Sequence, residues 1–274
     1  MLSMTNLRTV AFHSYKGGTG KTTLISNIAA LFAKNGFNVA LLDFDLYAPS
    51  LGAYYRKKPN LFINDLLSGQ AKISEIMHDL TNELDLQGRF LVGFSSPQKE
   101  DINELEVKHD SKWQIEAVRR FIAGKQELVD KYKIDYLFLD TSPGMRYWSI
   151  NTLATADCIF LLLKDSDMDI EGTRKMINDI YDSLCRYGAE YYIILNKVPG
   201  STVAGCTNEE TWIAELERIV GAQIIGCIPC YCDIQFSRHE FLFSIRQPDH
   251  PFSIRLVKVA ETIKAICQAP QRRT

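Results

Sequence analysis

The stretch TVAFHSYKGGTGKTT, residues 9–23, passes from an apolar run through a glycine-rich turn into residues that favour a helix. Its three glycines give the backbone conformations that other residues avoid, so that successive N–H groups point at an anion near the positive end of the following helix. Lys21 adds a point charge, and the hydroxyl of Thr22 suits a magnesium ion that bridges the terminal phosphates of a nucleoside triphosphate. The stretch therefore predicts a phosphate-binding loop between a strand and a helix.

The loop departs from the strict pattern G-x-x-x-x-G-K-[ST], because Tyr15 stands where that pattern has its first glycine. Residues 16–23, KGGTGKTT, carry a second lysine, Lys16, five positions before Lys21. This arrangement looks like the deviant Walker A motif, and the chain resembles the MinD/ParA group of dimerising ATPases, which also includes Mrp-type iron–sulfur carriers, the nitrogenase iron protein and arsenical-pump ATPases. By this resemblance the loop residues that bind nucleotide are Gly17, Gly18, Thr19, Gly20, Lys21, Thr22 and Thr23.

The composition points to a globular protein without a strong charge preference. A hydrophobic content of 46% is ample for a core, and a net charge of −2 gives no electrostatic reason to expect nucleic acid or anionic lipid as an obligatory partner. Seven cysteines, without a signal peptide pattern, favour reduced thiols and a cytoplasmic location. No apolar stretch reaches the length that a transmembrane helix needs.

A pair of acids follows the second apolar run. Residues 38–44, NVALLDF, are typical of a buried parallel strand, whose carboxyl end delivers Asp43 and Asp45 beside the phosphate loop. The resemblance implies that Asp43 orders the magnesium shell through water and that Asp45 positions and polarises the water that attacks the γ-phosphate. The alternative is that both are only turn acids at a strand end. The continuation through residues 46–52 is similar to the family's switch I loop.

A third motif follows the apolar run at residues 134–139. Asp140 and the turn TSPG, which ends at Gly144, are similar to the family's Walker B and switch II segments. An acid at the end of a buried strand next to the phosphate loop can hold a magnesium-bound water, and Gly144 can move its N–H towards or away from a γ-phosphate. A plain strand-end turn is the alternative. The metal residues are therefore expected to be Thr22, Asp43 and Asp140.

The sequence also suggests which base the nucleotide carries. Asn196 begins NKVP, which is reminiscent of the N-K-x-D motif of GTPases, but Pro199 stands where guanine selection requires an acid. As in MinD/ParA relatives, Asn196 would read adenine, so ATP is preferred to GTP; an asparagine that caps a turn is the alternative. Pro229 and Cys230 follow the last predicted strand, at the place where relatives fold a loop over the base.

The cysteines at 227–232 leave a second function open. Cys227, Cys230 and Cys232 have the spacing C-x-x-C-x-C, which a metal-cluster carrier or a metalloenzyme-maturation ATPase would use as ligands. Cys227 is expected to point into the sheet, and no second cysteine cluster completes four ligands, although a dimer could supply two cysteines from each chain. A non-hydrolysing scaffold that uses ATP only to fix a dimer is another alternative.

The apolar patterns predict a single doubly wound α/β domain over residues 1–274: a mostly parallel sheet of about seven strands with helices on both faces. Strands are predicted at 8–14, 38–44, 134–139, 157–163, 191–196 and 223–228, with an alternating stretch at 84–94. Helices are predicted at 21–35, 61–67, 73–80, from 111 onwards, at 170–187 and at 252–267. The last helix is expected to pack on the sheet rather than on a membrane.

The resemblance implies a magnesium-dependent ATPase that hydrolyses ATP slowly, dimerises on ATP and regulates a partner. The catalytic residues would be Lys16, Lys21 and Asp45, with Lys16 reaching across the dimer to the partner's nucleotide. The protein partner or activator is not identified by the sequence. Association with membrane or DNA has little support, because residues 226–274 hold only seven Lys/Arg against four Asp/Glu.

Overall fold

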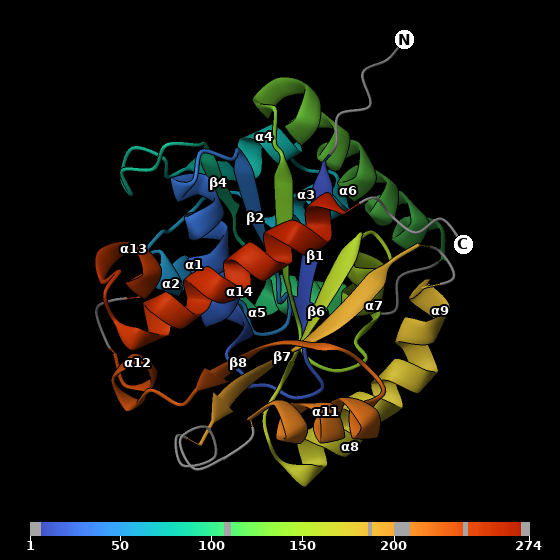
Figure 1. The fold of residues 1–274 in the computed structure, drawn as a ribbon. Coiled ribbons are helices and arrows are strands. Elements are labelled where there is room, and N and C mark those ends of the chain that lie inside the picture. The colour runs from blue at the N-terminus through green and yellow to red at the C-terminus, as the bar shows by residue number, and fades with distance from the viewer. Residues whose placement is uncertain (1–6, 107–110, 186–187, 200–208, 238–240, 270–274) are drawn as a thin grey trace.

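The computed structural model describes residues 7–106, 111–185, 188–199, 209–237 and 241–269. Its centre is one eight-stranded sheet in the order β3-β4-β2-β5-β1-β6-β7-β8, in which every pair is parallel except β3 with β4 (Figure 1). The strands are β1 Arg8–His13, β2 Val39–Phe44, β3 Met77–Asp79, β4 Phe90–Gly93, β5 Tyr136–Thr141, β6 Cys158–Leu163, β7 Glu190–Val198 and β8 Ile224–Pro229.

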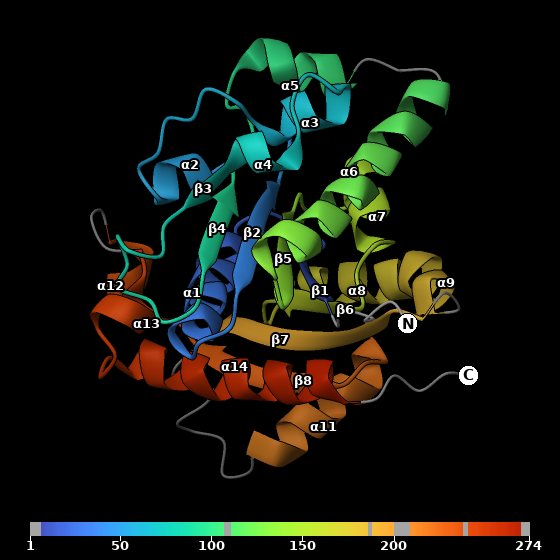
Figure 2. The same cartoon turned by 90° about the horizontal axis from the view of Figure 1, so that it is seen from above.

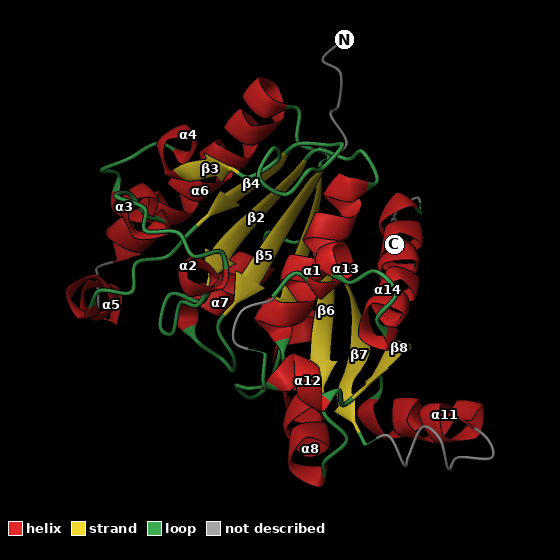
Figure 3. Ribbon diagram, turned by 90° about the vertical axis from the view of Figure 1, so that its left-hand side faces the viewer, coloured by secondary structure: helices red, strands yellow, loops and turns green. Residues whose placement is uncertain are grey.

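Helices cover both faces of the sheet, as the doubly wound prediction requires (Figures 2 and 3). They are α1 Lys21–Lys34, α2 Leu51–Tyr54, α3 Ile63–Ser68, α4 Ile73–Ile76, α5 Lys99–Glu106, α6 Ser111–Tyr132, α7 Tyr147–Leu153, α8 Asp167–Met176, the π-helix η1 Ile177–Tyr181, α9 Asp182–Cys185, α11 Glu209–Val220, α12 Cys232–Gln235, α13 Phe243–Arg246 and α14 Pro251–Gln268. Alternate residues of each strand enter opposite layers: Val10 and Phe12 pack with α1 and α14, whereas Ala11 packs with the layer of α6, α7 and α8. The predicted fold class is confirmed.

The strand count differs from the prediction because of β3. Residues 73–80 have a helical pattern, but only Ile73–Ile76 form a helix, and Met77–Asp79 pair antiparallel with β4. A pattern of that length supports barely two helical turns, and pairing with β4 gives the backbone groups of Met77–Asp79 partners that a frayed helix would lack. The additional strand, β3, is thus an edge strand that forms because it pairs with β4.

Two helices also differ in detail from their sequence patterns. The helix predicted from residue 170 begins at Asp167, where the Ser166 side chain accepts a hydrogen bond from the backbone N–H of Asp169, and its predicted end at residue 187 lies outside the described residues. The helix α14 buries Leu256, Ala260, Ile263 and Cys267 as expected, but Val257 is exposed. None of the helices in the described parts of the chain is long and apolar enough to cross a bilayer.

Three strands bring the predicted motifs to one edge of the sheet. Strand β1 leads into the phosphate loop and lies beside β5, with Phe12 in register with Asp140. Strand β2 lies on the other side of β5, with Asp43 in register with the same Asp140. The loop and two of the three acids therefore meet at the carboxyl ends of adjacent parallel strands, where α/β sheets bind ligands.

Candidate functional site

The phosphate loop is fixed by contacts from the end of β7. Gly18 and Gly20 have φ angles of 73° and 95°, in the left-handed region that glycine favours. Asn196 Nδ2 donates a hydrogen bond to the carbonyl of Thr19 at 2.7 Å, and Lys197 Nζ donates one to the carbonyl of Gly18 at 3.1 Å. A Cβ atom on Gly20 would lie 2.5 Å from Asn196 Nδ2. Gly20 is therefore required by its backbone conformation and by the close approach of Asn196.

Ser14 joins the two lysines of the loop to switch II. Its hydroxyl accepts a hydrogen bond from Lys21 Nζ at 3.2 Å and donates one to the carbonyl of Lys16 at 2.7 Å. Its own carbonyl accepts a hydrogen bond from the N–H of Gly144 at 2.9 Å. The N–H of Gly144 thus points at Ser14, the residue before the phosphate loop. The Lys21 side chain, which is buried, contacts the same serine.

The two carboxyl groups of β2 and β5 are buried side by side. Burial, together with the charges of Asp140 and Asp45, raises the pKa of Asp43 well above its usual value. Burial also raises the pKa of Asp140 to about 7, against the opposing effects of the Lys21 ammonium and of a hydrogen bond from Thr22. Two neighbouring buried carboxyl groups do not readily ionise together. A cation between or beside them would lower the pKa of both and allow both to ionise.

The switch I loop turns around Asp43. Its Oδ1 accepts a hydrogen bond from the N–H of Asp45 at 3.1 Å, and its Oδ2 accepts one from the N–H of Leu51 at 3.2 Å. Asp45, which is 9% exposed, accepts a longer hydrogen bond from the N–H of Ala48 at 3.3 Å. Asp43 therefore uses both of its oxygens to hold the loop, whereas Asp45 lies at the turn itself.

The oxygen atoms around Thr22 fit a magnesium ion. Thr22 Oγ1 donates to Asp140 Oδ2 at 2.7 Å and accepts from Ser50 Oγ at 3.3 Å. The other oxygen of Asp140 is buried without a hydrogen-bond partner, so it is an acceptor that a metal-bound water would satisfy. Among the residues that the structure describes, no three His, Cys, Asp or Glu side chains gather as metal ligands. Thr22 Oγ1 and the free oxygen of Asp140 are therefore the atoms that could hold a magnesium ion and one of its waters.

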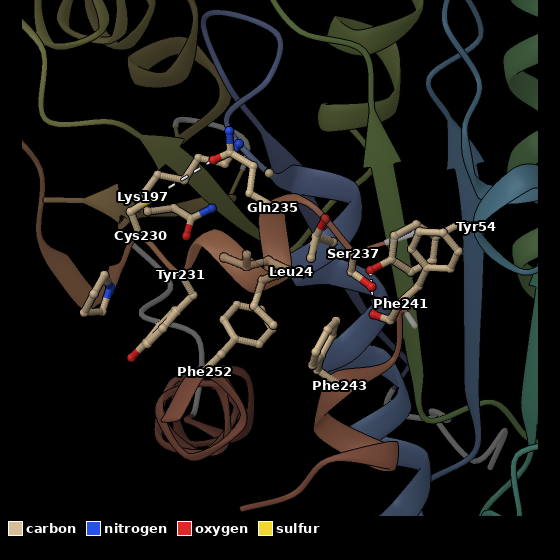
Figure 4. Close-up of a pocket in the computed structure, with 15 residues that line it drawn as sticks. Leu24, Tyr54, Lys197, Cys230, Tyr231, Gln235, Ser237, Phe241, Phe243 and Phe252 are labelled. Carbon is tan, nitrogen blue, oxygen red and sulfur yellow. Dashed lines mark hydrogen bonds between the residues drawn. The ribbon is translucent and has the colours of Figure 1, made fainter. Parts of the chain in front are cut away.

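A cavity of about 200 Å³ opens beside the loop at the ends of β7 and β8 (Figure 4). Its lining includes Gly20, Asn196, Pro229 and Cys230, all four predicted from the sequence, together with several aromatic rings. Because the Asn196 amide nitrogen already binds the carbonyl of Thr19, the carbonyl oxygen of that side chain is the polar atom best suited to a base. The amino group of adenine can donate to this oxygen, whereas the corresponding atom of guanine is an acceptor.

Lys16 lies outside its own phosphate site. Its Nζ is 3.6 Å from the sulfur of Met168, at the start of α8, and 5.9 Å from the centre of the Tyr15 ring. The Tyr15 ring in turn packs against Gly172, where an added Cβ would lie 2.1 Å from ring atoms. Tyr15, which replaces the first glycine of the strict motif, thus anchors the loop on α8. The Lys16 side chain contacts the same helix.

The three cysteines near β8 belong to different environments. Cys227 is buried in the layer of α8 and α11, whereas Cys230 and Cys232 are exposed. Cys230 lines the cavity with Phe243 and Phe252, which belong to the opposite core layer. The sheet therefore separates Cys227 from Cys230 within one chain.

Tyr54 and His13 were not predicted from the sequence, and Ser50 was predicted only as part of the switch I loop at residues 46–52. Ser50 and Tyr54 lie just after the acids of β2, and Tyr54 lines the cavity through a contact with Phe241, which no local pattern indicates. His13 is the last residue of β1. Burial, and then the Lys21 charge, lower its pKa to about 3, so it is neutral under ordinary conditions. In the sequence, only the position of His13 directly before the phosphate loop could have indicated that it belongs to the site.

Comparison with known proteins identifies the family of this chain and agrees with its fold. A family model described as an AAA domain matches residues 7–186. An uncharacterised ATP-binding protein of Methanocaldococcus jannaschii is 24% identical over 97% of this chain and 92% of its own length. The chromosome-partitioning ATPase Soj of Treponema pallidum is 26% identical over 63% of each chain. MinD in the MinC:MinD cell division protein complex of Aquifex aeolicus has the same fold, with a TM-score of 0.74 at 18% identity, covering 97% of this chain and 99% of that one.

The matched region contains the phosphate loop, both acidic motifs and the strands that carry them. The chain belongs to this AAA-domain family, and within it to the MinD/ParA-type P-loop ATPases.

Proposed function

We propose that this protein binds ATP with magnesium, hydrolyses it slowly to ADP and phosphate, and uses the nucleotide to switch a homodimer that acts on a partner protein. The observation that carries the proposal is the meeting of Thr22, Asp43 and Asp140 beside the buried Lys21. Hydroxyl, carboxylate and ammonium groups in this arrangement match the triphosphate and its metal ion. When bound, magnesium would neutralise charge on the β- and γ-phosphates, with Thr22 as its direct ligand and the two acids acting through water.

Asp43, in β2, and Asp45, just after it, have different tasks in this proposal. Asp43 is committed to the backbone N–H groups of Asp45 and Leu51, so its carboxyl orders the loop and the metal shell. Asp45 is then the better candidate to accept a proton from the attacking water or to orient it. The positive charge of Lys21 would stabilise the negative charge on the transferring phosphoryl group. The N–H of Gly144 would leave Ser14 to bind a γ-phosphate oxygen.

The base pocket supports ATP rather than GTP. Asn196 presents its carbonyl oxygen, which accepts from the adenine amino group, and Pro199 has no carboxylate for the guanine edge. Pro229 and Cys230 form the wall beside that base. The relative from M. jannaschii is an ATP-binding protein, which agrees with this choice.

The contact between Lys16 and Met168 supports a dimer. Lys16 does not turn towards the phosphate site of its own chain, where Lys21 already supplies the charge. A lysine directed outward at the loop's opening is free to serve a second copy. The MinD of A. aeolicus forms a complex with MinC, so a protein is the kind of partner we propose here. The named alternatives, a metal-cluster carrier and a non-hydrolysing scaffold, have no specific observation in their favour.

The proposal is tested by ATP binding and phosphate release in three variants. We expect Lys21→Ala to abolish ATP binding and Asp45→Ala to bind ATP without splitting it, because the two residues act on affinity and on chemistry respectively. Lys34→Ala, at the far end of the same helix α1, is the matched control and should behave like the native protein. Native-rate hydrolysis by Asp45→Ala in a single-turnover assay would contradict the assignment of the attacking water to this acid.

A further inference from the structure

The helix α2 contacts the metal side of the site at one end and the base pocket at the other. At its start, the N–H of Leu51 donates to Asp43 Oδ2 at 3.2 Å, and the capping residue Ser50 donates to Thr22 Oγ1 at 3.3 Å. At its end, the hydroxyl of Tyr54 donates to the carbonyl of Phe241 at 2.7 Å. A helix of four residues is only about 6 Å long. The two ends of the nucleotide site are therefore joined by one short, hydrogen-bonded element.

The base-pocket end of this link is anchored to α1. The carbonyl of Phe241 accepts a second hydrogen bond, from Asn27 Nδ2 at 2.9 Å, and the same amide donates to the carbonyl of Thr23 in the first turn of α1. Asn27 also accepts a hydrogen bond from the N–H of Ser244 at 3.0 Å. Phe241 is thus held against the helix that begins at the phosphate loop, and the Tyr54 hydroxyl connects that fixed point to α2.

Tyr54 faces the cavity that the base would occupy. Its ring and the Phe241 ring have centres 4.6 Å apart, and both residues line the cavity (Figure 4). A base that fills the cavity would therefore lie within reach of these two rings. The N–H of Tyr54 donates to the Ser50 carbonyl at 2.9 Å, so the residue at the base-pocket end of α2 is hydrogen-bonded directly to the residue at its metal end.

We propose that Tyr54 is a positioning residue that couples occupation of the base pocket to the placement of Asp43 and the switch I loop. Adenine, although remote from the reacting phosphate, would then help to set the acids for hydrolysis. Using the binding energy of a remote group at the reacting centre is a general means of raising the rate at saturation. The inference rests on the proposed ATPase function and deepens it, because it concerns how the same site responds to the base.

The test compares ATP with inorganic tripolyphosphate, which has the phosphates without the base, under saturating single-turnover conditions. In the native protein ATP should be split faster than tripolyphosphate. Tyr54→Phe removes one hydroxyl but keeps the ring, and Asn27 still holds the Phe241 carbonyl, so the fold should persist. The variant also loses a longer hydrogen bond, from Asn27 Nδ2 to the Tyr54 hydroxyl at 3.4 Å. We expect it to split ATP about three- to tenfold more slowly, the scale of these lost hydrogen bonds, with an unchanged rate for tripolyphosphate.

Tyr55→Phe is the matched control, because it removes a hydroxyl from the adjacent residue, whose ring packs on Phe90 and Phe94 away from the cavity. It should leave the ratio of the two rates at the native value. If Tyr54→Phe slows both substrates equally, the residue has only a structural role and the inference is wrong. An unchanged ratio together with unchanged rates also overturns it.

A second measurement separates this inference from the proposed hydrolysis. Hydrogen exchange of residues 43–55 is followed after adding ADP or pyrophosphate to the native protein and to Tyr54→Phe. ADP should protect this segment more than pyrophosphate does in the native protein, and the difference should vanish in the variant. A native protein that splits no ATP but shows this pattern would contradict the proposed hydrolysis and support the link. Equal protection by both ligands in the native protein would overturn the link whatever the hydrolysis rate.

Discussion

Asp43 and Asp140 lie opposite each other in register on the parallel strands β2 and β5, and each is buried. The pKa of both carboxyl groups is raised, by burial first and then, for Asp43, by the neighbouring acids. The sheet register thus places two carboxyl groups where neither ionises easily without a cation. Ionising both carboxyl groups therefore destabilises the folded, metal-free protein. Binding of a magnesium nucleotide would remove this destabilisation.

This relationship predicts how the stability of the metal-free protein depends on pH. The folded pKa of Asp140, about 7, lies above its unfolded value of 3.8, so its contribution to stability is fully present below pH 3.8 and is lost as the pH rises through 7. Asp140→Asn has no such titration. Urea unfolding in EDTA should therefore show the variant gaining stability relative to the native protein between pH 5 and pH 8, on the order of 1 kcal/mol or more.

His13 titrates in the opposite direction but does not disturb that comparison. Its folded pKa of about 3 lies below the unfolded value of 6.5, so its contribution is present above pH 6.5 and is lost as the pH falls towards 3, opposite in sign to that of Asp140. Because both proteins contain His13, its effect cancels in the difference between them. A difference that stays constant from pH 5 to pH 8 would show that the pKa of Asp140 is not raised.

Gly20→Ala should be more damaging than Gly18→Ala, although both positions have positive φ. Each substitution carries a left-handed strain of about 1–2 kcal/mol. Only at position 20 would the new Cβ displace Asn196, since nothing lies within 4 Å of the corresponding position at Gly18. Chemical unfolding should therefore show a further loss of about 1 kcal/mol for Gly20→Ala, from the hydrogen bond between Asn196 and Thr19. If both variants lose the same free energy of unfolding, the hydrogen bond of Asn196 does not require a glycine at position 20.

The sequence predicted the parts of the site that local patterns encode. The loop at residues 16–23 and the acids at 43 and 140 follow apolar runs, and parallel strands necessarily deliver their carboxyl ends to one edge. The contact between Tyr54 and Phe241 was not predictable in this way, because it joins residues 187 positions apart and depends on the course of two loops. Strand β3 was missed for a related reason, since its pairing with β4 outweighs a short helical pattern.

The cysteines lead to a prediction about metal content. Since Cys227 is buried on one side of the sheet and Cys230 is exposed in the cavity on the other, we expect them not to share a metal ion within one chain. Anaerobic purification followed by elemental analysis should find substoichiometric zinc, iron and nickel. Cys267→Ser, at a buried position in α14, is the control for nonspecific effects of losing a thiol. A reproducible metal that Cys230→Ser alone removes would favour the carrier function.

The position of Lys16 gives the prediction that bears most on the dimer. Its ammonium group rests near Met168 on α8, while Lys21 supplies the positive charge within the loop. We therefore expect Lys16→Ala to keep ATP affinity within a few-fold. Hydrolysis should fall on the order of a thousandfold or more, because a cation delivered to the transferring phosphoryl group of a second copy acts as an arginine finger does. On a sizing column we expect Asp45→Ala to form an ATP-dependent dimer and Lys16→Ala to fail to form it.

Met168→Ala distinguishes a trans-acting lysine from one that merely supports α8. This substitution removes the resting contact of Lys16 but leaves the lysine itself, and Met168 is 69% exposed, so the fold should tolerate it. If Lys16 acts on the partner's nucleotide, Met168→Ala should dimerise and hydrolyse ATP at least as well as the native protein, since the lysine no longer has to leave the methionine. If the contact with Met168 is what matters, both variants should lose activity together. Normal hydrolysis by a Lys16→Ala protein that remains monomeric with ATP would exclude both the trans role and the dimer switch built on it.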